Sequence, residues 1–124
     1  MLNSEQLIDK VKTYNKFLDL DKLTKAYAFA IKVHKNQKRD SGDPYSNHPI
    51  AVASILTELK LDSATITTGL LHDTIEDTYA TYETIKKEFG QEIADLVDGV
   101  TKISVFENKA KANSKAENFR KLIL

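Results

Sequence analysis

Apolar residues recur every three or four positions along most of this chain, which is the spacing of an amphipathic helix. A first helix is expected to begin at Leu2 or Ser4. A second helix is expected to follow an Asp21 cap, because a short polar side chain can bond the free amides of a first turn. The inward positions of these two helices are Leu7, Val11, Tyr14, Leu18, Leu23, Ala26, Tyr27, Ala30, Ile31 and His34.

The helical pattern stops at residues 38–45, which are dense in turn-forming residues and predict a loop without a tight hairpin. A third helix is expected to begin at His48 or Pro49, since proline suits the first helical turn, and to end near Lys60. Its apolar residues are Ile50, Val52, Ala53, Ile55, Leu56 and Leu59.

The second half of the chain predicts further helices. A fourth, capped by Asp62 or Ser63, is expected to run to about Ile75. A fifth begins at Thr81 and is stopped by Gly90. A sixth covers residues 91–101, with inward positions at Ile93, Leu96, Val97 and Val100.

The last residues of the sequence predict a surface for a partner. Residues 103–112 look irregular, and residues 114–124 are helical again. This last helix ends on an apolar run, Leu122-Ile123-Leu124, without a capping residue. We expect it to support self-association or to meet a second chain.

Composition narrows the class of protein. The chain has 124 residues, of which 41% are hydrophobic and 29% charged, and it contains no cysteine. It shows no strand alternation, so an all-α single domain over residues 1–124 is expected, without disulfides or thiolate zinc sites. No apolar run approaches the roughly 20 residues of a membrane helix, so we expect no membrane contact and a cytoplasmic location.

The charges are unevenly distributed although they sum to zero. Residues 1–61 carry 10 Lys and Arg against 7 Asp and Glu, residues 62–101 carry 2 against 9, and residues 102–124 carry 6 against 2. The acidic middle indicates either a cation site or simply solvated helix faces. Without a dominant basic surface, nucleic acid is not an expected partner.

The residues that could bind a metal or take part in catalysis cluster around His72, which follows an apolar run. His72 and Asp73 stand one helical turn before Glu76 and Asp77, so His72 would face Glu76 and Asp73 would face Asp77. Such a group on an apolar helix is costly unless it is paired or binds a cation. Mixed nitrogen and oxygen ligands suit Mn²⁺, Fe²⁺ or Zn²⁺, but an acidic helix end in water fits the spacing equally well.

Other polar residues can join this group through the fold. His48 begins the preceding long helix, and antiparallel helices bring such positions together. The loop before it contains Lys38, Arg39 and Ser41, which can bind an anionic substrate or remain solvated. No cysteine, Gly-x-Ser-x-Gly turn or glycine-rich phosphate loop is present, so a nucleophilic triad or a phosphate loop is not expected.

Two long runs carry a family resemblance. Residues 37–49 (QKRDSGDPYSNHP) and residues 70–77 (LLHDTIED) closely resemble the hydrolase domain of RelA/SpoT-type enzymes, which are HD phosphohydrolases with a helical fold. The resemblance continues through residues 89–90, 97–102 and 116–121, and it covers the chain from about residue 20 to its end.

The resemblance implies a manganese-dependent hydrolase of (p)ppGpp that releases pyrophosphate from the 3′ position and leaves GDP or GTP. It assigns the metal to His48, His72 and Asp73, and the positioning and activation of the attacking water to Glu76 and Asp77. It also implies that Arg39 packs on the guanine and that Ser41 lies in the same nucleotide-binding loop. Lys38, in that loop too, is the third residue that we expect to bind the anionic substrate.

Two departures from the family pattern leave alternatives open. Asp40 stands where many relatives carry a basic or small residue. The family's fourth metal ligand is an Asp in a Lys-Leu-Ala-Asp-Arg-type segment that this sequence does not contain, so the domain is expected to be incomplete at its C-terminal end. The alternatives are an inactive or split fragment that binds nucleotide or a partner chain without turnover, and a hydrolase of another nucleotide.

Overall fold

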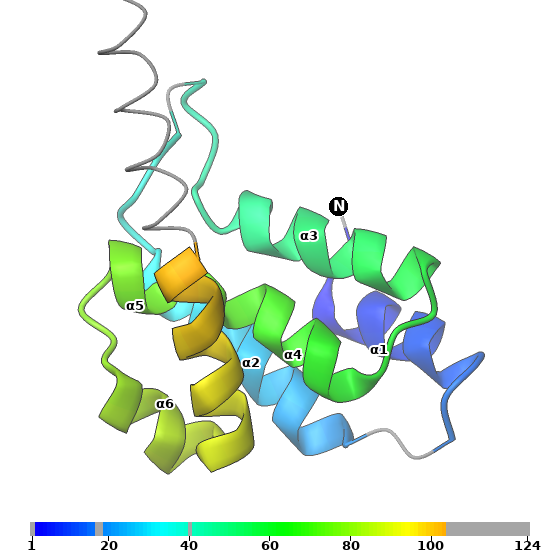
Figure 1. Cartoon of the computed structure of the whole chain (residues 1–124). Helices are drawn as coiled ribbons and strands as arrows, with labels where there is room; N and C mark the ends of the chain where they lie inside the picture. The colour runs from blue at the N-terminus through cyan, green and yellow to red at the C-terminus, as the bar shows by residue number, and fades with distance from the viewer. Residues whose placement is uncertain (1, 17–18, 40, 104–124) are drawn as a thin grey trace, which may run out of the picture.

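The computed structural model describes residues 2–16, 19–39 and 41–103, and in these residues the chain is an assembly of helices (Figure 1). The helices are α1 (Ser4–Lys12), α2 (Leu20–Val33), α3 (Asn47–Glu58), α4 (Ser63–Leu71), α5 (Thr74–Asp77) and α6 (Tyr82–Phe89). Residues 91–103 form a further helix after α6. No strand occurs within the described ranges, which confirms the all-α class. None of the helices found there is long and apolar enough to cross a membrane.

Capping side chains fix where the helices begin. Asn3 and Gln6 form a reciprocal capping box at α1, and Asp62 accepts the Thr65 amide hydrogen at the start of α4. The predicted N-cap of α2, Asp21, was wrong by two residues. Its cap is Asp19, which accepts from the Lys22 amide at 3.0 Å, whereas Asp21 lies in the first turn.

The fourth predicted helix is interrupted in the middle of the candidate site. It was expected to run to about Ile75, but α4 ends at Leu71 and a turn separates it from the four-residue α5. The Thr74 hydroxyl donates to the Leu71 carbonyl at 2.8 Å, which offers that carbonyl a partner other than a helical amide. His72 and Asp73 therefore occupy a turn between two helices rather than the face of one helix.

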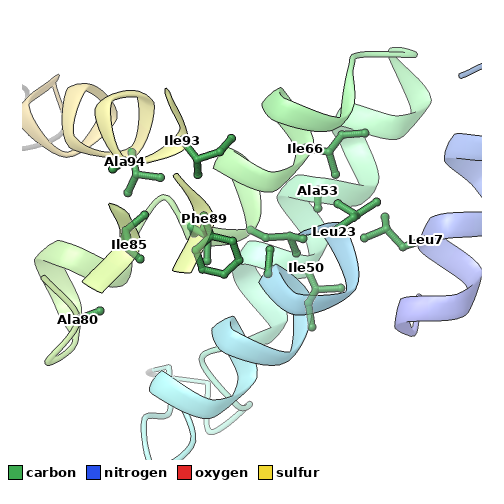
Figure 2. Packing of buried hydrophobic residues seen from close by; sticks show 14 of the residues in the cluster. Leu7, Leu23, Ile50, Ala53, Ile66, Ala80, Ile85, Phe89, Ile93 and Ala94 are labelled. Carbon is green, nitrogen blue, oxygen red and sulfur yellow. The ribbon is translucent and has the colours of Figure 1, made fainter. Parts of the chain in front are cut away.

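The core lies where α2, α3 and α4 meet and continues to α6 and the helix after it (Figure 2). Side chains from each of these elements are fully buried there: Leu23, Ala53, Ile66, Leu70, Leu71, Ile85, Phe89 and Val97. Gly69 allows α4 to approach α3 closely, because a Cβ at this position would lie 2.6 Å from Leu56 Cδ1. This contact holds the C-terminal end of α4 against α3.

Three residues expected to face inward are partly exposed. Ile31 is 41% exposed, Leu96 43% and Val100 37%. The predictions for Leu18, Asp40 and the segment from residue 104 onward, including the apolar Leu122-Ile123-Leu124 end, fall outside the described residues.

Candidate metal centre

His48, His72 and Asp73 lie together although 24 residues separate the first two. One ligand atom from each side chain can be chosen so that all three atoms lie within 4.8 Å of one another. The Asp73 Oδ2 atom lies 3.1 Å from His72 Nε2 and 3.4 Å from His48 Nε2. All three side chains are partly buried, with exposures of 35% for His48, 18% for His72 and 14% for Asp73.

The helices bring these side chains together through their packing. His48 is the second residue of α3, while His72 and Asp73 occupy the turn after α4. Because α3 packs directly against α4, the start of one helix lies beside the end of the other. The two imidazole rings meet edge to face with their centroids 5.2 Å apart.

A hydrogen bond to the backbone orients His72. Its Nδ1 lies 2.6 Å from the Gly69 carbonyl oxygen, which can only accept, so Nδ1 carries the hydrogen. In a neutral ring Nε2 then presents a lone pair to the Asp73 carboxylate. Two lone pairs at this distance repel each other unless a proton or a cation lies between them. The donor set therefore fits a divalent cation, which two imidazoles and a carboxylate commonly bind.

Burial and the neighbouring charges shift the pKa values of His48, His72 and Asp73 in different directions. Burial alone would lower the pKa of His72, but its hydrogen bonds to Asp73 and Gly69 and the nearby carboxylates raise it overall. Burial works in the opposite direction on Asp73, yet the bond to His72 and the charges of both histidines hold the pKa of Asp73 below its usual value. Burial lowers the pKa of His48, with Arg39 adding to the effect.

Tyr45 connects the centre to a further carboxylate. Its hydroxyl lies 2.7 Å from Asp77 Oδ2 and 3.2 Å from Asp73 Oδ2. Burial raises the pKa of Tyr45, and the hydrogen bond to Asp77 raises it further, so the phenol remains a donor at neutral pH. Asp73 and Asp77 therefore share one hydroxyl donor, as their one-turn spacing allows.

Two residues behind Tyr45 were not predicted as part of the site. The His34 ring stacks on the Tyr45 ring with centroids 4.6 Å apart, and its Nδ1 lies 2.8 Å from Gln37 Oε1. The Gln37 amide donates to the Asp77 carbonyl at 2.6 Å. The only signal in the sequence is that His34 continues the buried face of the second helix; nothing in the spacing connects it with Asp77.

The other predicted site residues surround the centre without joining it. Glu76 is exposed and makes no hydrogen bond or ion pair with any residue that the structure describes. Lys38, Arg39 and Ser41 are also exposed, in the loop between α2 and α3. That loop projects from the helices beside α5 (Figure 1).

The loop is more ordered than the sequence indicates. Lys38 and Pro44 form an isolated antiparallel bridge, and the Arg39 amide donates to the Asp43 carbonyl at 2.9 Å. Gly42 has a φ of +89°, a conformation that residues with a Cβ rarely adopt. The segment is thus a loop without a tight hairpin, as the sequence predicts, and its one bridge closes a short turn that carries Arg39 and Ser41.

Comparison with known proteins gives a consistent family. A sequence model described as an HD domain matches residues 26–124. The chain is 56% identical over 117 residues to a GTP pyrophosphokinase of Myxococcus xanthus, and this match covers 92% of the chain and 16% of that protein. It is 45% identical over 120 residues to the bifunctional (p)ppGpp synthase/hydrolase SpoT of Escherichia coli K12, covering 97% of the chain and 17% of that protein. The chain thus spans about one sixth of the length of these relatives.

A solved structure supports the same assignment. It is described as a metazoan ortholog of SpoT that hydrolyzes ppGpp and plays a role in starvation responses. It is 36% identical to this chain with a TM-score of 0.62, and the match covers 64% of this chain and 47% of that one. The matching family model and the shared helical fold lead to one conclusion: the chain belongs to the HD domain family, in the form found in RelA/SpoT proteins.

Proposed function

We propose that this chain is a metal-dependent hydrolase of (p)ppGpp, which releases pyrophosphate from the ribose 3′ position and leaves GDP or GTP. The observation that carries this proposal is that His48, His72 and Asp73 each place a ligand atom within 4.8 Å of the other two. The E. coli relative is named as a (p)ppGpp synthase/hydrolase, and the structural relative is described as hydrolyzing ppGpp. Both descriptions agree with the chemistry of the site.

The proposed cation is Mn²⁺, held by His48, His72 and Asp73. A divalent ion bound by such ligands would lower the pKa of a water molecule bound to it, so that a hydroxide nucleophile could form near neutral pH. The ion would also screen the charge of the phosphates. The chain supplies two imidazole nitrogens and one carboxylate that face each other, as required for mixed nitrogen and oxygen ligation. Their partial burial limits competition from bulk water.

The two remaining carboxylates have different environments and, we infer, different roles. Glu76 is exposed and lies outside the group formed by the three proposed ligands, so its side chain is available to take up the proton of the attacking water. Asp77 accepts a hydrogen bond from Tyr45, which fixes its direction. In the overall reaction, water adds a hydroxyl to the phosphorus at the 3′ oxygen, the 3′ O–P bond breaks, and that oxygen ends with a proton.

The bridged turn between α2 and α3 is the proposed nucleotide-binding segment. Arg39 lies nine residues before His48, and its positive charge adds to the burial that lowers the pKa of His48. The guanidinium is planar and permanently charged, so it suits packing on a guanine ring beside phosphates. Lys38 and Ser41, on the same turn, add a cation and a hydroxyl for the phosphate oxygens.

The direct experiment is to measure pyrophosphate release from ppGpp with added Mn²⁺, comparing the wild type with Asp73→Ala. Release by the wild type, with the Asp73→Ala protein at background, supports the proposal. A folded wild type that binds ppGpp in calorimetry without releasing pyrophosphate would instead support a binding role. Equal turnover of ppGpp and ordinary nucleoside triphosphates would indicate a hydrolase of broader specificity.

A further inference from the structure

The hydroxyl of Tyr45 is the one side-chain donor, among the described residues, that reaches both Asp73 and Asp77. A phenol has a single hydrogen to donate. The shorter contact, 2.7 Å against 3.2 Å, gives this hydrogen to Asp77. A cation bound to Asp73 would weaken the competing acceptor and so favour the bond to Asp77 further.

The position of that hydroxyl is fixed from behind by aromatic packing. His34 is 1% exposed, and its ring stacks on Tyr45 at an interplanar angle of 29°. His48 meets another part of the same tyrosine ring, at 6.3 Å and nearly perpendicular. Tyr45 therefore has an imidazole on each of two sides, and its ring has little freedom to rotate away from Asp77.

Gln37 fixes the other side of the contact. Its amide donates to the Asp77 backbone carbonyl, so its oxygen is the atom that faces His34, and the His34 Nδ1 must carry the hydrogen. One side chain thus ties the buried histidine of α2 to the last residue of α5. Gln37 thus binds the backbone of Asp77 while Tyr45 binds its carboxylate.

We propose that Tyr45 is a positioning residue that, braced by His34 and Gln37, holds the Asp77 carboxylate in its working orientation. This inference rests on the proposed function, since it assigns Asp77 a role in turnover. It adds three residues to the site that make no contact with a reacting atom. Such residues act through geometry, because small displacements of a catalytic group reduce turnover strongly.

The test uses Tyr45→Phe, which keeps the ring and its stacking and removes only the hydroxyl. At saturating Mn²⁺ we expect kcat for pyrophosphate release to fall about tenfold or more while KM changes less than about twofold. Tyr27→Phe is the matched control, because its half-buried hydroxyl donates to the Leu2 carbonyl at 2.7 Å, far along the chain from the site. That control should retain its kcat.

A second comparison separates positioning from a general structural effect. If Tyr45 acts through Asp77, the Tyr45→Phe change should cause less than about a twofold further loss in an Asp77→Asn background. An unchanged kcat in the single variant, or an equal additional loss in the double variant, would overturn the proposal.

Crystal structures provide a readout that does not depend on turnover. In Tyr45→Phe the Asp77 carboxylate should leave the position that it occupies in the wild type, while the backbone of α5 remains in place through Gln37. A carboxylate in the same position in both proteins contradicts the inference. A wild type without any turnover would count against the proposed function alone, and the crystal comparison would still decide the role of Tyr45.

Discussion

His72 Nε2 lies 3.1 Å from Asp73 Oδ2 while the opposite ring nitrogen of His72 is bonded to the Gly69 carbonyl. The hydrogen bond from Nδ1 to Gly69 leaves Nε2 as the nitrogen that is available to a ligand, and the Asp73 carboxylate lies beside Nε2. This arrangement is typical of metal-binding histidines, in which a second contact sets the ring orientation. The orientation of the proposed ligand His72 is thus fixed by the protein before any cation binds.

Metal affinity should depend on pH through His72. Its raised pKa means that a proton competes for Nε2 up to pH values above the ordinary 6.5. We expect Mn²⁺ affinity, measured by calorimetry between pH 5.5 and 8, to fall by up to about tenfold per pH unit below that raised pKa. The lowered pKa of Asp73 keeps this carboxylate ionised over the range. A flat profile would show that His72 is not a ligand.

The Asp62 cap should stabilise the fold by a pH-dependent amount. Bonds to the side chain and amide of Thr65 lower the pKa of Asp62, so its contribution is present above the unfolded value of 3.8 and is lost as the pH falls through the folded value. Asp62→Ala should cost about 1 kcal/mol at pH 7, measured by urea unfolding. The difference from wild type should shrink in acid, and Asp62→Asn should lose less. An equal difference at both pH values contradicts this role.

Arg39 should affect substrate binding more than the chemical step. Arg39→Ala is expected to raise KM for ppGpp about tenfold, with a smaller change in kcat, because the lost contact is made in the bound and reacting states alike. Lys12→Ala removes an exposed charge at the end of α1 and serves as the control. If both variants raise KM equally, general electrostatic attraction explains the effect and the bridged turn has no specific role.

Glu76 should be separable from metal binding. Glu76→Gln is expected to lower kcat by a factor on the order of 10² or more, with Mn²⁺ affinity close to that of the wild type. The reason is that Glu76 lies outside the group formed by the three proposed ligands. Glu83→Gln, in the first turn of α6, removes an exposed carboxylate as the control. Loss of metal binding together with turnover would instead make Glu76 a ligand.

Local sequence rules predicted most of the helices because local interactions determine them. The Thr81 cap and the Gly90 stop of α6 were predicted correctly, and both act within one turn of the chain. The prediction of the α2 N-cap was wrong because both Asp19 and Asp21 have side chains that can cap a helix. Only the observed bond from the Lys22 amide to Asp19 decides between them.

The site was harder to predict because its contacts are distant in sequence. Tyr45 meets Asp73 and Asp77 across 28 and 32 residues, and Gln37 meets the Asp77 backbone across 40. Helical periodicity contains no information about such pairs. It also predicted a continuous helix through His72, because a side-chain bond from Thr74 to a backbone carbonyl is invisible to an apolar pattern.

The central claim is that His48, His72 and Asp73 hold a divalent cation, and anomalous diffraction tests it most directly. Crystals of the wild-type protein soaked in millimolar Mn²⁺ should show their strongest anomalous peak bonded to Nε2 of both histidines and a carboxylate oxygen of Asp73. His72→Ala crystals treated in the same way should lack that peak. A strongest peak elsewhere in the wild type, or none at all, would contradict the account.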